Sequence, residues 1–152
     1  MNTLFIFCAK YLIVLSPLLT LWILYQAPAH IRKEMLWQGL FSMPLTFLLG
    51  LLARALYFDP RPFVVGNFTP LIYHVADNGF PSDHLLLASA LASLTGLFHR
   101  RVGLILWGIA LVVGLARIYV GVHHFVDILG SMVIALVSSY LVYFVFQRLK
   151  KL

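Results

Sequence analysis

The sequence predicts an all-α protein, a polytopic bundle of about five transmembrane helices, because of its composition and its apolar runs. Hydrophobic residues make up 62% of the 152 residues and charged residues only 11%, and the mean hydropathy is +0.96. A soluble fold of this length cannot hide so much apolar surface, so the expected solvent is a lipid bilayer. The single cysteine, Cys8, allows no internal disulfide. These features exclude a soluble domain, a disordered chain and a secreted disulfide scaffold.

Five apolar runs follow one another along the chain, each near the length of about 20 residues that spans a bilayer. They cover residues 4–25, 36–58, 85–98, 102–122 and 125–146, and residues 81–84 are expected to add a first turn to the third. We expect the first run to be retained as a helix and not cleaved as a signal peptide, because its basic residue, Lys10, lies inside the run and not before it. Residues 1–152 are expected to form one integral-membrane domain.

Basic residues set the expected orientation of these spans. They gather between the first and second runs, between the third and fourth, and in the tail: Arg32, Lys33, Arg100, Arg101, Arg148, Lys150 and Lys151. With five spans these segments share one side, which the positive-inside rule makes cytoplasmic. The N-terminus is then outside, the C-terminus cytoplasmic, and the loop 59–81 outside. The net charge of +6 is explained in this way without a nucleic-acid partner.

The first of three polar blocks lies where the second span ends. Arg54 and Arg61 are separated by nearly two helical turns, and Pro60 and Pro62 should end the helix between them. Two guanidinium forks near one point suit a phosphate group. The alternative is that Arg54 extends to the lipid head groups and Arg61 is a plain loop charge.

The second block, Pro81-Ser82-Asp83-His84, has the features of a helix start. Ser82 or Asp83 can cap this helix, which is the usual role of such residues. A helix N-terminus also offers free N–H groups to an anion, and His84 in its first turn can act as a general acid.

The third block runs from Arg117 to Asp127. His123 and Asp127 are four residues apart, so we expect them on one helix face, with Asp127 fixing the tautomer of His123 and leaving a nucleophile or base. Gly121 suggests a corner between two helices, which would bring Arg117 to the same anion. A purely structural Asp–His pair is the alternative.

At these blocks the sequence resembles the type 2 phosphatidic acid phosphatase superfamily of membrane lipid phosphatases. Its three motifs are Lys-x6-Arg-Pro, Pro-Ser-Gly-His and Ser-Arg-x5-His-x3-Asp. All three are matched in order and spacing between residues 54 and 127. Three positions depart from the motifs: Arg54 replaces Lys, Asp83 replaces Gly and Ala116 replaces Ser. Members usually have six spans, one more than the five expected here.

The Pro-Ser-Asp-His form looks like the branch of undecaprenyl-diphosphate phosphatases linked to bacitracin resistance. This resemblance implies a bacterial cytoplasmic-membrane enzyme, with its active site facing outward, that releases phosphate from undecaprenyl diphosphate through a phosphohistidine, without metal or cofactor. It implies His123 as nucleophile, Asp127 as its orienting carboxylate and His84 as general acid. The phosphate-binding residues it implies are Arg54, Arg61, Ser82 and Arg117, with Asp83 as a modulator.

Several alternatives stay open on the sequence. The substrate could be phosphatidate, phosphatidylglycerol phosphate or a lipid A phosphate, since the motifs hold a phosphate and not a lipid tail. The phosphohistidine could also pass its phosphoryl group to a lipid acceptor. An ion or proton transporter subunit would spread ionisable residues across the membrane depth. A haem-binding anchor with His84 and His123 as ligands leaves the three arginines unexplained. The sequence does not define the oligomeric state.

Overall fold

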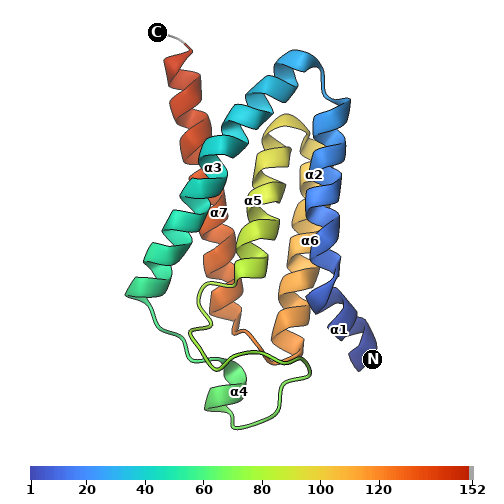
Figure 1. Ribbon diagram of the computed structural model, residues 1–152, viewed down its shortest axis with the longest axis vertical. Helices are drawn as coiled ribbons and strands as arrows, with labels where there is room; N and C mark the ends of the chain where they lie inside the picture. The colour runs from blue at the N-terminus through green and yellow to red at the C-terminus, as the bar shows by residue number, and fades with distance from the viewer. Residues whose placement is uncertain (151–152) are drawn as a thin grey trace.

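The computed structural model describes residues 1–150, which are helical except for one long loop and short turns (Figure 1). The helices are α1 (Asn2–Lys10), α2 (Leu15–Gln26), α3 (Ala29–Leu56), α4 (Pro62–Val65), α5 (Asp83–Phe98), α6 (Arg100–Tyr119) and α7 (Phe125–Leu149), with a 3₁₀ turn at Leu12–Val14. The all-α class expected from the sequence is confirmed. Residues 151–152, and with them Lys151 of the expected basic tail, lie outside the described residues.

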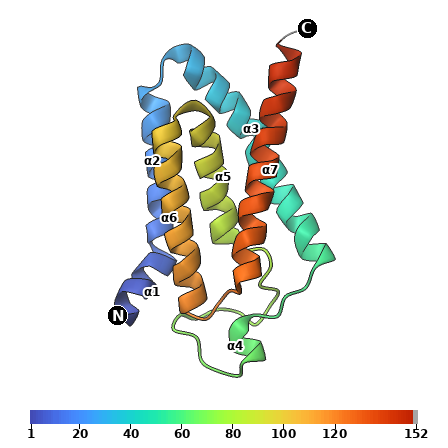
Figure 2. The ribbon, with the colours of Figure 1, turned by 180° about the vertical axis from the view of Figure 1, so that it is seen from behind.

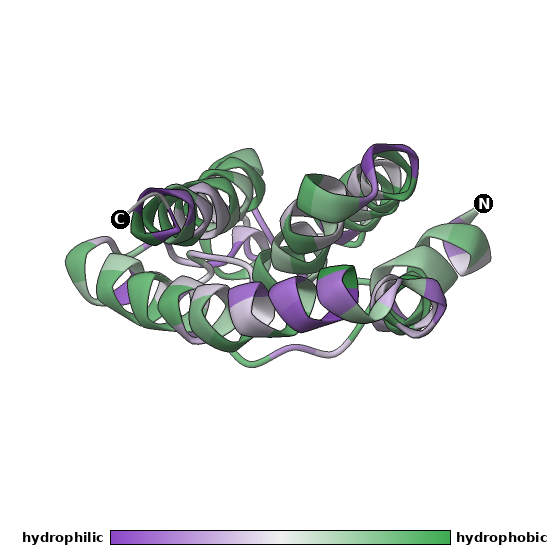
Figure 3. Ribbon diagram, turned by 90° about the horizontal axis from the view of Figure 1, so that it is seen from above, coloured by the Kyte–Doolittle hydropathy of each residue, from purple (hydrophilic) through white to green (hydrophobic). Residues whose placement is uncertain are grey.

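Within the described residues, four helical segments are long and apolar enough to cross a membrane. They are Asn2–Gln26, which joins α1 and α2, Ala29–Leu56, Arg100–Tyr119 and Phe125–Leu149. The fifth apolar helix, α5, has 16 residues. Large apolar side chains on the outside of the bundle are more than half exposed, among them Leu4, Phe47, Leu104 and Val137. Figure 3 shows hydrophobic residues along most of the helices. A surface of this kind suits lipid and not water, so the chain is an integral membrane protein.

The centre of the bundle is α5, which contacts α2, α3, α6 and α7 (Figures 1 and 2). All residues from 88 to 95 are buried by these neighbours. Where α5 meets α6, a Cβ on Gly103 would overlap the backbone of Gly96, so small residues permit this close approach. Buried hydroxyls find partners across the bundle, as between Thr20 and Thr95 at 3.0 Å.

Two helix boundaries differ from those expected. The second helix begins at Ala29 and not near residue 36, so Arg32 and Lys33 lie in the first turns of α3 and not in a connector. Both side chains are exposed, and both are good helix formers, so the helix extends past its apolar part. The first run is not one regular helix, because α1 ends at Lys10 and the 3₁₀ turn follows.

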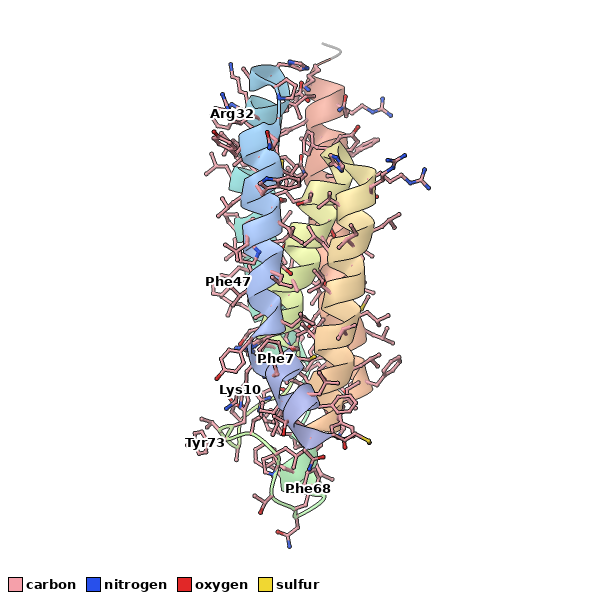
Figure 4. All side chains as sticks on the ribbon, turned by 90° about the vertical axis from the view of Figure 1, so that its right-hand side faces the viewer. Phe7, Lys10, Arg32, Phe47, Phe68 and Tyr73 are labelled. Carbon is pink, nitrogen blue, oxygen red and sulfur yellow. The ribbon has the colours of Figure 1, made fainter. Side chains whose placement is uncertain are left out.

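The two ends of the bundle carry different residues. One end, which we call the loop end, holds α4, the loop 66–82 and the turn 120–124. The other end, which we call the basic end, holds the α2–α3 and α5–α6 turns and the end of α7 (Figures 1 and 2). In Figure 4, Phe68 and Tyr73 mark the loop end and Arg32 marks the basic end.

Candidate active site

The three polar blocks of the sequence meet at the loop end. Arg54 lies in the last turn of α3, Asp83 begins α5, and α6 joins α7 through the turn 120–124. The long loop after α4 passes below these helix ends (Figure 2). Residues that lie far apart in the chain therefore share one region.

Gly121 makes the turn between α6 and α7 possible. Its φ is +82°, and a Cβ at this position would lie 2.6 Å from the ring of Phe68, so a side chain would be strained and crowded. The Val122 N–H donates to the carbonyl of Arg117 at 3.2 Å. The corner expected at Gly121 is present, and it folds His123 back toward Arg117.

His123 and Asp127 form a buried pair. His123 is 3% exposed and Asp127 fully buried, and Nδ1 of His123 lies 3.0 Å from Oδ2 of Asp127. His123 precedes α7 and is not itself helical, so the turn and not a shared helix face brings the two together. Because the carboxylate accepts, the proton of a neutral ring is assigned to Nδ1, which leaves Nε2 with a free lone pair.

Two guanidinium groups converge on Nε2 of His123. Nη2 of Arg117 lies 3.3 Å away and Nη1 of Arg61 lies 3.4 Å away. Burial first, and then the charges of Arg117 and Arg61, lower the pKa of His123 from 6.5 to about 2. The imidazole is therefore neutral at ordinary pH, as a nucleophile has to be.

Arg61 and Arg117 are both buried but have different partners. Arg61 donates from Nε to Oδ1 of Asp77 at 2.6 Å and from Nη1 to the carbonyl of Val122 at 2.9 Å. Arg117 donates to the carbonyl of Ala9 at 3.3 Å, and its Nε has no hydrogen-bond partner among the described residues. Arg117 thus retains a free donor and forms no ion pair with a carboxylate of the described residues.

Arg54 and the start of α5 form the outer part of the site. Nη2 of Arg54 donates to Oδ1 of Asp83 at 2.6 Å and to the carbonyl of Pro81 at 3.3 Å. Arg54 and Asp83 are two of the three departures from the family motifs, and they contact each other. Ser82 is at the N-cap of α5, but its buried hydroxyl caps nothing and has no partner among the described residues. His84, half-buried, lies in the first turn.

The sequence argument missed a second histidine–carboxylate pair beside the first. Nδ1 of His124 lies 2.8 Å from Oδ2 of Asp59, and the His124 N–H donates to Asp127 at 2.9 Å. His124 links the loop after α3 to Asp127. The available signal was the acidic residue two positions before Arg61.

Loop residues close the site from below. Both the oxygen and the nitrogen of the Asn78 side-chain amide form hydrogen bonds. The oxygen accepts from the N–H groups of Asp59 and Phe80, and the nitrogen donates to the carbonyls of Arg54 and Tyr57. A Cβ on Gly79 would lie 3.0 Å from Asp127, so the loop passes close to the carboxylate.

Two titratable residues of the same loop reach the buried groups. The ring centroid of His74 lies 6.1 Å from that of His123. Burial, and then the charge of Arg61, lower the pKa of His74. For Asp77, burial would raise the pKa, but the hydrogen bond and charge of Arg61 outweigh it and the pKa is lowered.

One group of metal-ligating residue types lies close together within the described part of the chain. The ligand atoms of Asp59, His124 and Asp127 are all within 4.8 Å of one another. Direct hydrogen bonds already join His124 to both carboxyl groups, from its ring to Asp59 and from its backbone to Asp127. These hydrogen bonds hold the turn, while Oδ1 of Asp127 has no partner among the described residues. A neutral imidazole beside two buried guanidinium groups is instead suited to receive a phosphoryl group.

Comparisons with known proteins place this chain in a family. The model of the PAP2 superfamily matches residues 35–151. Undecaprenyl-diphosphatase BcrC of Bacillus subtilis is 35% identical over 141 residues, which cover 93% of this chain and 72% of that protein. Putative undecaprenyl-diphosphatase YbjG of Escherichia coli is 30% identical, with 91% and 70% covered. The crystal structure of Aquifex aeolicus LpxE has the same fold, with a TM-score of 0.73, 24% identity, and 93% and 84% of the two chains covered.

Proposed function

The chain belongs to the PAP2 superfamily, and on that premise we propose that it hydrolyses undecaprenyl diphosphate to undecaprenyl phosphate and inorganic phosphate. One observation carries the proposal: Nε2 of His123 faces two guanidinium groups while Nδ1 is held by a buried carboxylate. Two relatives, BcrC of Bacillus subtilis and YbjG of Escherichia coli, are named as an undecaprenyl-diphosphatase and a putative one, which supports this substrate. The whole chain acts as one phosphatase domain.

In the first step, Nε2 of His123 attacks the terminal phosphorus. A phosphorus–nitrogen bond forms, and the bond from that phosphorus to the bridging oxygen breaks. His84 donates a proton to the leaving lipid phosphate. In the second step water attacks the phosphohistidine, with His84 accepting the proton, and inorganic phosphate leaves.

The arginines stabilise the charge that develops on the phosphoryl oxygens. Arg117 and Arg61 contact the nucleophilic nitrogen, so a phosphorus bonded to that nitrogen brings its oxygens next to both guanidinium groups. The unpartnered Ser82 hydroxyl and the N–H groups at the start of α5 add donors, and Arg54 holds a phosphate from the outer side. The cationic charge needed for phosphoryl transfer comes in this way from side chains, without a metal.

The number of spans and the positions of the basic residues set the orientation in the bilayer that we propose. Five spans, with α5 as the third, place the N-terminus outside and the C-terminus in the cytoplasm. The basic end then faces the cytoplasm through Arg32, Lys33, Arg100, Arg101, Arg148 and Lys150, in agreement with the positive-inside rule. The active site lies at the outer face of a bacterial cytoplasmic membrane, near the depth of the head groups.

An apolar groove between α3 and α5 offers a place for the lipid chain. It has a volume of about 160 Å³, and Phe47, Leu86 and Leu87 are among its lining residues. Asp83 also lines it, so the groove begins at the polar site. A lipid whose phosphate lies near Arg54 would extend its first carbons along this groove.

The alternatives differ in substrate or in class. The groove has no group that selects an isoprenoid, so phosphatidate, phosphatidylglycerol phosphate and lipid A phosphates are the competing substrates, and a lipid acceptor would make the enzyme a transferase. A transporter subunit is disfavoured because the buried charged side chains of the described residues lie at the loop end: Arg61, Arg117, His123 and Asp127.

The test is phosphate release from undecaprenyl diphosphate by the purified protein in detergent with EDTA present. We expect turnover, and a phosphorylated intermediate that is labile in acid, stable in base and absent from His123→Ala. Rapid turnover of another lipid phosphate in place of undecaprenyl diphosphate would contradict the substrate, and an intermediate that persists in His123→Ala would contradict the mechanism.

A further inference from the structure

Two of the three arginines in the site are occupied by carboxylates of the chain itself. Asp77 lies 2.6 Å from Nε of Arg61, and Asp83 lies 2.6 Å from Nη2 of Arg54. Arg117 has no carboxylate within ion-pair distance among the described residues. The proposed phosphate-binding groups therefore fall into one free arginine and two that are already paired.

The two carboxylates are exposed, whereas the groups that they pair with are less so. The Asp77 side chain is 55% exposed and that of Arg61 is 6% exposed; the Asp83 side chain is 71% exposed and that of Arg54 is 38% exposed. A carboxylate lowers the cost of burying a guanidinium, and an exposed carboxylate can also withdraw into water at small cost. Asp77 lies on the long loop and Asp83 is the first residue of α5, so neither lies in the middle of a helix.

Charge also limits what the site attracts in its present state. Three guanidinium groups, Arg54, Arg61 and Arg117, face four carboxyl groups, Asp59, Asp77, Asp83 and Asp127. An anionic substrate therefore gains little from the local charge unless carboxylates leave. The family motif has a neutral residue in place of Asp83, so this acid is not a requirement of phosphohistidine chemistry.

We propose that Asp77 and Asp83 are internal anions that hold two of the phosphate-binding arginines until substrate phosphates displace them. A monophosphate displaces at least one carboxylate, whereas a diphosphate that spans both arginines displaces both. Each carboxylate therefore lowers the affinity of the site for phosphate groups. This inference rests on the proposed function, and it adds which groups of the chain the substrate phosphates replace.

The test compares Asp77→Asn, Asp83→Asn and the double variant with the unchanged protein. Inorganic phosphate and inorganic pyrophosphate serve as probes, first as inhibitors of undecaprenyl diphosphate hydrolysis. We expect each single substitution to strengthen inhibition by phosphate about threefold to fivefold, the range for loss of a competing exposed ion pair, and the double substitution to strengthen it further. Inhibition by pyrophosphate should strengthen at least as much in the double variant, because pyrophosphate displaces both carboxylates.

Glu34→Gln is the matched control, because Glu34 is a partly exposed acid paired with Lys150 at 2.8 Å at the basic end. It should leave both inhibition constants unchanged. Phosphate inhibition that stays the same or weakens in both Asp77→Asn and Asp83→Asn would overturn the proposal, as would an equal change in Glu34→Gln.

A second readout separates this inference from the proposed function. The rise in thermal unfolding temperature caused by each probe measures binding without turnover, in detergent, on the full chain. If undecaprenyl diphosphate is not hydrolysed, the substrate assignment fails, while a larger stabilisation by phosphate in the variants still supports the internal-anion role. Equal stabilisation by phosphate in all four proteins would overturn it.

Discussion

The loop end and the basic end of the bundle both carry several cationic side chains, but in different environments. At the basic end the arginines and lysines are exposed, and two cavities of about 370 and 640 Å³ lie nearby with mostly apolar linings. At the loop end Arg61 and Arg117 are 5% and 2% exposed, and both contact a buried histidine. The larger cavities are thus not where the reactive groups converge. Buried, paired charge identifies the candidate site better than cavity size does, because burying a charge is costly and persists only where it is used or compensated.

The largest expected effect comes from His123→Ala. Removing the nucleophile should lower kcat by at least about 10⁴-fold. His30→Ala, an exposed histidine at the basic end, should leave phosphate release unchanged, and His124→Ala should reduce but not abolish it. Comparable steady-state rates for His123→Ala and the unchanged protein would remove the nucleophile assignment.

Arg117→Ala should have the next largest effect. It deletes the guanidinium that has no carboxylate partner among residues 1–150, so kcat should fall about 10²- to 10³-fold, as for loss of one donor to a transition-state oxyanion. Arg101→Ala at the basic end removes an exposed charge and should have no measurable effect. A similar loss in both variants would mean that the two ends do not differ in the way described.

Asp59→Asn examines the second histidine–carboxylate pair. The substitution keeps a hydrogen-bond acceptor for His124 but removes the negative charge at residue 59, so the turn that carries His123 is held less firmly. We expect kcat to fall about tenfold with KM nearly unchanged, the effect of weakening one charged hydrogen bond. A change in KM alone would show that Asp59 acts on substrate binding and not on positioning.

Leu87→Trp narrows the groove between α3 and α5. Val137→Trp is the matched control, because it narrows a second apolar groove, which lies between α3 and α7. Both residues are about half exposed and line apolar grooves. Leu87→Trp should raise KM for undecaprenyl diphosphate about fivefold, through roughly 1 kcal/mol of lost apolar contact, and leave KM for a short-chain diphosphate unchanged. An equal rise in Val137→Trp would contradict the assignment of the chain to the first groove.

The smallest effect concerns stability and pH. The pKa of His123 is lowered on folding, so below pH 6.5 the unfolded chain binds a proton that the folded chain does not. Stability should therefore decrease as pH falls below 6.5, by up to about 1.4 kcal/mol per pH unit, or about 3–6 °C in Tm. His74, whose pKa is also lowered, acts in the same direction. Thermal unfolding of His123→Ala should depend less steeply on pH between 5 and 7, and an equally steep dependence would contradict the buried neutral imidazole.

The contacts that sequence reasoning anticipated are mostly local. The four-residue spacing of His123 and Asp127, and the glycine between Arg117 and His123, limit where these side chains can lie, and the structure brings them together. The pairs that were missed join residues distant in the chain: Arg61 with Asp77, and Asp59 with His124. A loop has no periodicity that relates its residues to a helix end, so no sequence pattern predicts such pairs.

The departures from the family motifs show the same limit. Arg54 and Asp83 were each recognised as unusual, but each was considered alone. Their contact at 2.6 Å depends on how the end of α3 packs beside the start of α5, which the spacing of 29 residues between them does not specify.

The amino-acid sequence by itself determined the lipid environment, the helical class and the three polar blocks. Hydropathy and the positions of proline and glycine act on the chain over a few residues, so their effects can be predicted without the tertiary structure. Only the tertiary structure decided which charges pair. Ion pairing depends on distances between separate helices and loops, and these are set by how the helices and the loop pack together. The division of the arginines into one free and two carboxylate-bound groups is therefore a property of the packed bundle.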